Sequence, residues 1–275
     1  MKRILIVGLL VAVTVFGVYY FFSPVRIRIE RRSYTPFIPT PIEDYGEPET
    51  KEDFLAYAII TGDETKVRQL LDEGVSANAE ADIMPAASTF LMLAIEHGRE
   101  QTVSLLLEKG ADIHATDYHG RSALNVAIDY EHTNILSLLI SNGASLSGYT
   151  SWGATPLMDA LNKRRFAIAD TLVRSGADVN QKHAEDGIFP LHLAVALRRP
   201  EQVRLLIDNG AFVDKQSDYG VTALMIAAMS GYDELVRLLL DRGASVSISD
   251  NQNKTALAWA REKRHSACVK LLSGH

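Results

Sequence analysis

Residues 155–180 read TPLMDALNKRRFAIADTLVRSGADVN and contain two apolar patterns with helical spacing. Leu157 and Ala160 are three residues apart, which places them on one face of a short helix. A second apolar stripe starts at Ala169 and continues with Leu-Val three residues later. Gly176 follows and supplies the left-handed residue that commonly ends a helix. The stretch therefore predicts a unit of two short antiparallel helices.

The same unit recurs along most of the chain. The Leu-x-x-Ala pair of the first helix occurs at Leu55/Ala58, Leu91/Ala94, Leu124/Ala127, Leu157/Ala160, Leu191/Ala194, Leu224/Ala227 and Leu257/Ala260. Successive alanines are 33 to 36 residues apart. Neither helix of a unit can bury its stripe alone, so the units must stack and share one elongated core. The predicted fold is an all-α solenoid of helix-turn-helix units.

The repeat resembles the ankyrin repeat, whose first helix opens with T-P-L-H-x-A. The best copies of this motif are residues 155–160, TPLMDA, and 189–194, FPLHLA. The family's closing G-A-D-V-N is present at residues 176–180. The resemblance covers residues 53–275 and implies about seven repeats with hairpin-like fingers, the first and last repeats acting as caps. Residues 80–88 form a longer connection without a finger Gly, for which we expect an altered or disordered finger.

The N-terminal segment has a different character. Residues 4–22, ILIVGLLVAVTVFGVYYFF, contain no charged side chain and would span about 28 Å as a helix, close to the thickness of a bilayer core. The aromatic cluster at its end suits a membrane interface. We expect residues 1–22 to form an uncleaved transmembrane signal-anchor helix. A cleaved signal peptide lacks its small-residue cleavage site here, and a buried core helix would be polar on one face.

Residues 23–52 contain five of the nine prolines and predict an extended juxtamembrane spacer. The alternation over 25–29, VRIRI, also suits a short strand, although no partner strand is evident.

Two signals for the orientation of the chain in the membrane conflict. The short basic tail favours a body outside the cytoplasm, whereas four arginines at positions 26–32 favour a body inside it. We expect a single-pass membrane protein with an extracytoplasmic (periplasmic) ankyrin domain.

The charge distribution excludes several functions. Residues 33–275 carry 22 basic and 33 acidic side chains, a balance of 22 − 33 = −11, which disfavours nucleic acid as a partner. The single cysteine, Cys268, excludes an internal disulfide and a cysteine zinc site.

No phosphate-binding, hydrolase or metalloprotease motif is present, so we expect no catalysis, cofactor, metal or small-molecule substrate. His192 occupies the motif histidine position and is assigned a structural role.

Candidate partner-binding residues lie in two groups. The finger group contains side chains typical of binding hot spots: Tyr118, His119, Tyr149, Trp152 and Tyr219, with Lys182, His183 and Asn251 as weaker candidates. Half-buried packing between fingers is the alternative for the aromatic residues. The turn group is basic and could face an acidic partner or lipid head groups: Lys163, Arg164, Arg198 and Arg199, with Arg165, Arg261, Lys263 and Arg264 nearby. Ordinary solvated turn residues are the alternative there.

The expected function is a membrane-tethered scaffold that recruits an unidentified protein on the concave face of the solenoid. The alternative is a regulatory or protective accessory of a membrane or periplasmic enzyme, for example in stress resistance. Family membership alone selects neither, since one scaffold supports many partners.

Overall fold

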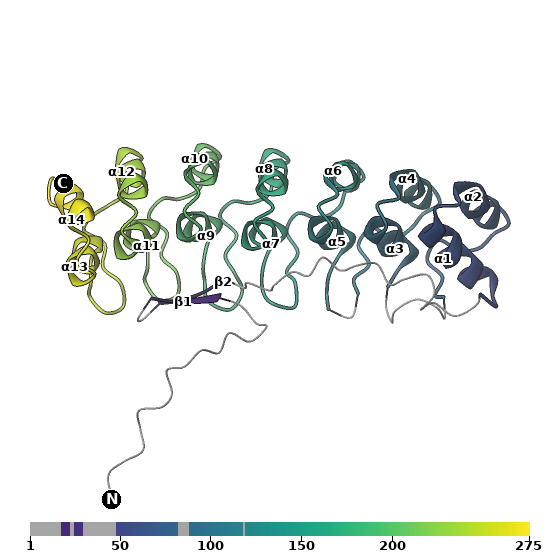
Figure 1. The fold of residues 1–275 in the computed structure, drawn as a ribbon, viewed down its shortest axis with the longest axis horizontal. Helices are drawn as coiled ribbons and strands as arrows, with labels where there is room; N and C mark the ends of the chain where they lie inside the picture. The colour runs from purple at the N-terminus through teal and green to yellow at the C-terminus, as the bar shows by residue number, and fades with distance from the viewer. Residues whose placement is uncertain (1–17, 23–24, 30–47, 82–87, 118) are drawn as a thin grey trace, which may run out of the picture.

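The computed structural model describes residues 18–22, 25–29, 48–81, 88–117 and 119–275. Its helices form pairs that stack in one direction (Figure 1). The first helices of the pairs are α1 (Lys51–Thr61), α3 (Phe90–Glu96), α5 (Ala123–Asp129), α7 (Pro156–Asn162), α9 (Pro190–Ala196), α11 (Ala223–Ser230) and α13 (Ala256–Glu262). The second helices are α2 (Glu64–Asp72), α4 (Glu100–Glu108), α6 (Thr133–Ser141), α8 (Phe166–Arg174), α10 (Pro200–Asp208), α12 (Asp233–Asp241) and α14 (Ser266–Leu272).

The predicted repeat is confirmed, because in the described part of the chain each of the seven Leu-x-x-Ala motifs lies in the first helix of a helix pair. Figure 1 shows the first helices as one row, with the second helices on one side and the finger loops on the other. The core lies between the two rows. The motif alanines are at most 3% exposed. Because their side chains are small, each first helix can approach its neighbours closely.

Local sequence signals set the helix ends. The motif Thr or Ser before most first helices accepts a hydrogen bond from the backbone N–H three residues later, as Thr155 does from Met158. The Gly after each second helix from α2 to α12 has a left-handed φ, for example 91° at Gly176. These caps explain how helices of seven to eleven residues can form, although such lengths are marginal in isolation.

Polar side chains connect successive units. The Asn180 side chain donates to the carbonyl of Gly210 at 2.8 Å and accepts from the N–H of Phe212 at 2.9 Å. His192 accepts from the N–H of Phe189 through Nδ1, and its Nε2 lies 3.1 Å from the carbonyl oxygen of Lys215. This confirms the structural role predicted for His192. Burial lowers the pKa of His192 to about 4, so the ring is neutral at physiological pH.

At residues 18–22 the structure has a strand, where the expected helix over residues 1–22 would end. Strand β1 (Val18–Phe22) pairs antiparallel with β2 (Val25–Ile29), and Val18 is opposite Ile29. The strand alternative at 25–29 therefore has a partner, and the aromatic end of the uncharged segment supplies it. Residues 1–17 lie outside the described residues. Among the described residues, no helix is long and apolar enough to span a membrane.

Helix α1 begins at Lys51, because Thr50 and Asp53 form a reciprocal capping box at its start. The altered finger expected at residues 80–88 falls mainly on residues 82–87, which lie outside the described residues.

Candidate protein-binding surface

The exposed sides of the first helices and the fingers form one continuous side of the solenoid (Figure 1). In a first helix, the motif leucine, the alanine and the residue after the alanine face the second helix. At 100° per residue, the position before the alanine and the position two after it lie on the opposite side. We call these two positions the inner face. The stacking core does not require a particular residue there.

The fingers hold one another in place through backbone hydrogen bonds. The Ala184 N–H donates to the carbonyl of Gly153 at 2.9 Å, and the Asn251 N–H donates to that of Tyr219 at 3.2 Å. Side chains reinforce this ladder, since the amide of Gln216 donates to the carbonyl of Ser249 at 3.0 Å. The fingers that contain Gly153, Ala184, Tyr219 and Asn251 are therefore fixed relative to one another, which reduces the entropy lost on binding a partner.

Two predicted aromatic residues occupy equivalent finger positions. Trp152 and Tyr219 each precede a finger glycine with left-handed φ, and each is 41% exposed. His119 has the same position in its own finger, before Gly120, and is also exposed. Tyr149 is 47% exposed, and its hydroxyl donates to the carbonyl of Lys182 at 3.1 Å. These four candidates therefore share the finger layer.

The other finger candidates are less uniform. Tyr118 lies outside the described residues. Lys182 pairs with Asp218 at 3.3 Å, and the amide of Asn251 donates to the carbonyl of Asp218. His183 contacts Asp186, with 3.0 Å between Nδ1 and Oδ1. Burial opposes the charged form of His183, but this carboxylate outweighs it and raises the pKa of the ring. These contacts connect neighbouring fingers or stabilise a single finger.

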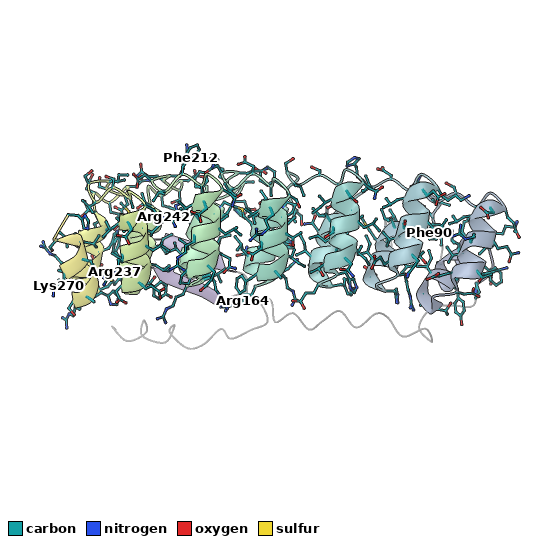
Figure 2. All side chains as sticks on the ribbon, turned by 90° about the horizontal axis from the view of Figure 1, so that it is seen from above. Phe90, Arg164, Phe212, Arg237, Arg242 and Lys270 are labelled. Carbon is teal, nitrogen blue, oxygen red and sulfur yellow. The ribbon has the colours of Figure 1, made fainter. Side chains whose placement is uncertain are left out.

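The basic turn candidates lie at the opposite edge of the solenoid. Figure 2 shows Arg164 at one edge and Phe212 at the other, which is the finger edge. Two residues of the predicted basic turn group contact aromatic rings of the solenoid. Arg199 stacks on Phe166, with 4.1 Å from its guanidinium carbon to the ring centre. Arg198 lies 5.4 Å from the ring centre of Tyr232. Arg164 remains exposed.

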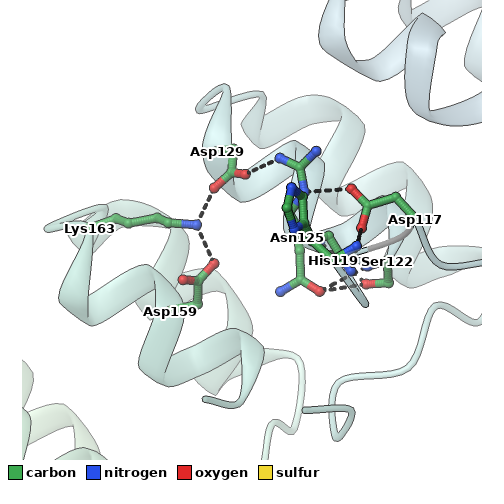
Figure 3. Close-up of polar contacts among 8 residues, drawn as sticks. Asp117, His119, Ser122, Asn125, Asp129, Asp159 and Lys163 are labelled. Carbon is green, nitrogen blue, oxygen red and sulfur yellow. Dashed lines mark hydrogen bonds and ion pairs between the residues drawn. The ribbon is translucent and has the colours of Figure 1, made fainter. Parts of the chain in front are cut away.

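A charge cluster covers the inner face from α3 to α7. It consists of Glu96, Asp117, Arg121, Asp129, Asp159 and Lys163. Arg121 bridges Asp117 and Asp129 at 2.7 and 3.0 Å, and both carboxylates are nearly inaccessible to solvent. Lys163 joins Asp129 to Asp159, so three units share one network (Figure 3). The predicted turn residue Lys163 is therefore a network member.

The surroundings of the cluster raise the pKa of two of its members, Lys163 and Glu96. Burial opposes the charge of Lys163, but the carboxylates of Asp159 and Asp129 raise its pKa. For Glu96 the balance goes the other way. Burial, with smaller contributions from Asp117 and Asp129, raises the pKa of Glu96 to about 7, although Arg121 opposes the shift. This cluster was not among the residues predicted from the sequence. Its available signal was Asp129 and Asp159, acidic residues at inner-face positions of adjacent units.

The repeat geometry agrees with comparisons to known proteins. A family model described as "Ankyrin repeats (3 copies)" matches residues 42–117, 116–183 and 191–275. The chain belongs to the ankyrin-repeat family. Ankyrin-repeat domains generally mediate protein–protein interaction, and the fold is typically a non-enzymatic scaffold. No curated protein matches the chain.

Several solved structures share the fold. The ankyrin-repeat domain of Bcl-3, described as a unique member of the IkappaB protein family, is 28% identical with a TM-score of 0.71. The alignment covers 79% of this chain and 97% of that domain. The ankyrin-repeat protein EF0377 is 27% identical, with a TM-score of 0.62 and coverage of 67% and 96%. The human ASB11 domain, at 24% identity, 79% and 96% coverage and a TM-score of 0.63, supports the fold alone.

Proposed function

We propose that this protein is a scaffold that recruits a protein partner through its finger tips and inner face. Residues 4–22 would attach it to a membrane, with the ankyrin domain on the extracytoplasmic side. The observation that carries the proposal is the pair of exposed aromatic residues, Trp152 and Tyr219, at equivalent positions of two fingers. Tyr and Trp are the side chains most enriched at binding hot spots.

The surrounding structure supports this use of the two aromatic residues. Both occupy fingers that take part in the backbone ladder, so binding would order few additional groups. Phe212 adds a third aromatic side chain at the finger edge and is 58% exposed. An isolated exposed aromatic residue is unremarkable, whereas three on one edge provide a surface for a partner.

The partner surface is tested by crosslinking in cells that express the full chain. A photo-crosslinking residue at position 151, beside Trp152, captures the partner. We expect Trp152→Ala combined with Tyr219→Ala to reduce the captured complex more than about tenfold, as loss of two hot-spot side chains should. Phe54→Ala is the matched control, since Phe54 is an exposed aromatic residue on α1. Equal capture by the double variant and the control would exclude the aromatic surface.

Membrane attachment needs a separate test. The uncharged run at residues 4–22 is long enough to span a bilayer as a helix. We expect the full chain to remain in the membrane fraction after alkaline extraction. A reporter that is active only outside the cytoplasm, fused at His275, should be active. Release of the protein by extraction contradicts the anchor, and activity of a cytoplasm-specific reporter contradicts the orientation.

A further inference from the structure

Two adjacent fingers are joined next to Trp152, one of the two aromatic residues on which the proposed function rests. They comprise residues 147–153, which we call the Trp152 finger, and residues 181–188, which we call the following finger. The N–H of Ala184 donates to the carbonyl of Gly153 at 2.9 Å. This bond holds the chain directly after Trp152, so the position of the indole depends on how the two fingers are held together.

The ring of His183 bridges these two fingers. Its Nδ1 lies 3.0 Å from Oδ1 of Asp186 in the following finger, and each of the two side chains is only 16% exposed. The ring is also hydrogen-bonded to the backbone carbonyl of Trp152. It packs closely against the Trp152 finger, since a Cβ added at Gly153 would lie 3.4 Å from its Cε1. One side chain thus contacts an acceptor on each finger.

The number of N–H groups on the imidazole decides whether both contacts can form. A protonated ring has two N–H groups and can donate to the carboxylate and to the carbonyl together, whereas a neutral ring has one. Hydrogen bonds to ionised groups are about twice as strong as bonds between neutral groups. A neutral His183 therefore keeps the bond to Asp186 and loses the bond to the carbonyl of Trp152.

We propose that His183 is a pH-sensitive clamp, which holds the Trp152 finger when its imidazole is protonated and releases it when the imidazole is neutral. The inference rests on the proposed function and deepens it, because a fixed Trp152 loses less entropy on binding a partner. Partner binding through Trp152 is then stronger at acidic pH than at alkaline pH. The bond between Ala184 and Gly153 contains no titratable group, so the release concerns the finger tip and not the stack.

Two carboxylates of the following finger determine the direction of the pH effect. Burial opposes protonation of His183, but the contact with Asp186 and the nearby charge of Glu185 outweigh it and raise the pKa of the ring above its ordinary 6.5. The bond to the carbonyl of Trp152 acts in the same direction. The clamp is therefore closed below pH 6.5 and opens as the pH rises through the raised pKa.

Three other titratable groups lie on the elements around this finger. Tyr149 is the only titratable side chain of the Trp152 finger, and its hydroxyl donates to the carbonyl of Lys182 at 3.1 Å. Asp218, on the next finger along the chain, pairs with Lys182. His192 of α9 lies in the field of Asp186, but burial lowers its pKa to about 4 and keeps this ring neutral at higher pH. Histidine is the side chain whose charge ordinarily changes near neutral pH, so His183 supplies the titration.

Fluorine NMR of the purified full chain, labelled with fluorinated tryptophan, tests the clamp without a partner. The chain contains two tryptophans, and Trp152→Phe assigns their signals. The signal of Trp152 should follow one titration curve between about pH 5 and about pH 9. Its midpoint should lie above 6.5. Trp259, which is buried and donates to Asp250, is the internal reference and should not follow the curve.

Two variants of the clamp are compared with a control. His183→Gln keeps a side-chain donor but cannot change its charge, so the titration of the Trp152 signal should disappear. Asp186→Asn removes the carboxylate and should move the midpoint to a lower pH. The control, His114→Gln, changes an exposed histidine outside these two fingers, and its curve should match that of the wild type.

The outcomes of this titration are distinct. A curve that persists in His183→Gln, or a wild-type Trp152 signal that does not change with pH, overturns the clamp. If His183→Gln loses its helical circular dichroism, Asp186→Asn alone decides the outcome. An unchanged midpoint in Asp186→Asn then overturns the clamp.

The consequence for the partner is measured by crosslinking through residue 151 in lysates of the same cells, adjusted to about pH 6 and about pH 8. Capture by the wild type should be about three- to tenfold greater at the lower pH, the effect of one hydrogen bond, and His183→Gln should show no such difference. Equal capture by the wild type at both values contradicts this consequence. Absence of capture at both values contradicts the proposed function, whereas the NMR titration contains no partner and tests the clamp separately.

Discussion

The inner face of the solenoid differs between its two halves, because each of α3, α5 and α7 has a polar residue at one or both positions, whereas α9 and α11 have apolar residues at both. We call these the charged half and the apolar half. From α3 to α7 it carries the charge cluster, whose four carboxyl groups surround Arg121 and Lys163. On α9 and α11 it carries Leu193, Ala196, Ile226 and Met229. The first helices of both halves are seven or eight residues long. The core therefore leaves the inner face free to vary, and this freedom makes one scaffold usable for different contacts.

The charged half should be the more sensitive to loss of a single side chain. Arg121→Met removes the guanidinium that bridges Asp117 and Asp129, two carboxylates with almost no access to water. Breaking a buried pair typically destabilises a protein by about 3–5 kcal/mol, because an uncompensated charge stays buried. We expect a loss of this size in the free energy of unfolding, measured by urea denaturation.

The control for this prediction is an exposed ion pair on the fingers. Lys182→Met removes the contact with Asp218, in which both side chains are about half exposed. Pairs of this kind contribute at most about 1 kcal/mol. Similar losses for Arg121→Met and Lys182→Met would mean that the cluster is solvated, and the contrast between the two halves would then not be electrostatic.

The apolar half should respond to cavity formation. Met229→Ala truncates a side chain that is 2% exposed on α11, and such truncations cost about 2–5 kcal/mol. Asn162→Ala changes the equivalent position of α7, where the side-chain oxygen is buried without a hydrogen-bond partner. Removing an unsatisfied polar group is close to neutral. Thermal unfolding of both variants measures the difference, and a cost below about 0.5 kcal/mol for Met229→Ala would mean that Met229 is not packed in the interior.

The stack could be predicted from the sequence because its determinants are local. The Leu-x-x-Ala spacing, the Thr or Ser caps and the left-handed glycines recur with a fixed period, and His192 follows from its motif position. The charge cluster could not be predicted in the same way. Arg121 and Lys163 are 42 residues apart in the sequence and meet through Asp129 only after three units have stacked. The strand pair β1–β2 was not predicted, because the length and apolarity of residues 4–22 favour a helix and give no sign of the pairing with residues 25–29.

The charged half should also make stability depend on pH in a way that the apolar half cannot. The pKa of Glu96 is raised from its ordinary 4.5 to about 7, chiefly by burial. Between these values the native state keeps a proton that the unfolded chain releases, so the contribution of Glu96 to stability is present below pH 4.5 and is lost as pH rises through 7.

Glu96→Gln keeps the shape of the side chain and remains neutral at every pH. At pH 8 the variant should therefore be more stable than the wild type, by about 3 kcal/mol at most, since one pKa unit corresponds to about 1.4 kcal/mol. At pH 4.5 the two should be nearly equal. Urea denaturation at both pH values measures the difference, and Glu64→Gln on the exposed start of α2 is the control that should show no such trend. A difference between Glu96→Gln and wild type that does not change with pH would mean that Glu96 is ionised in the native protein, and that Arg121 neutralises three carboxylates rather than two.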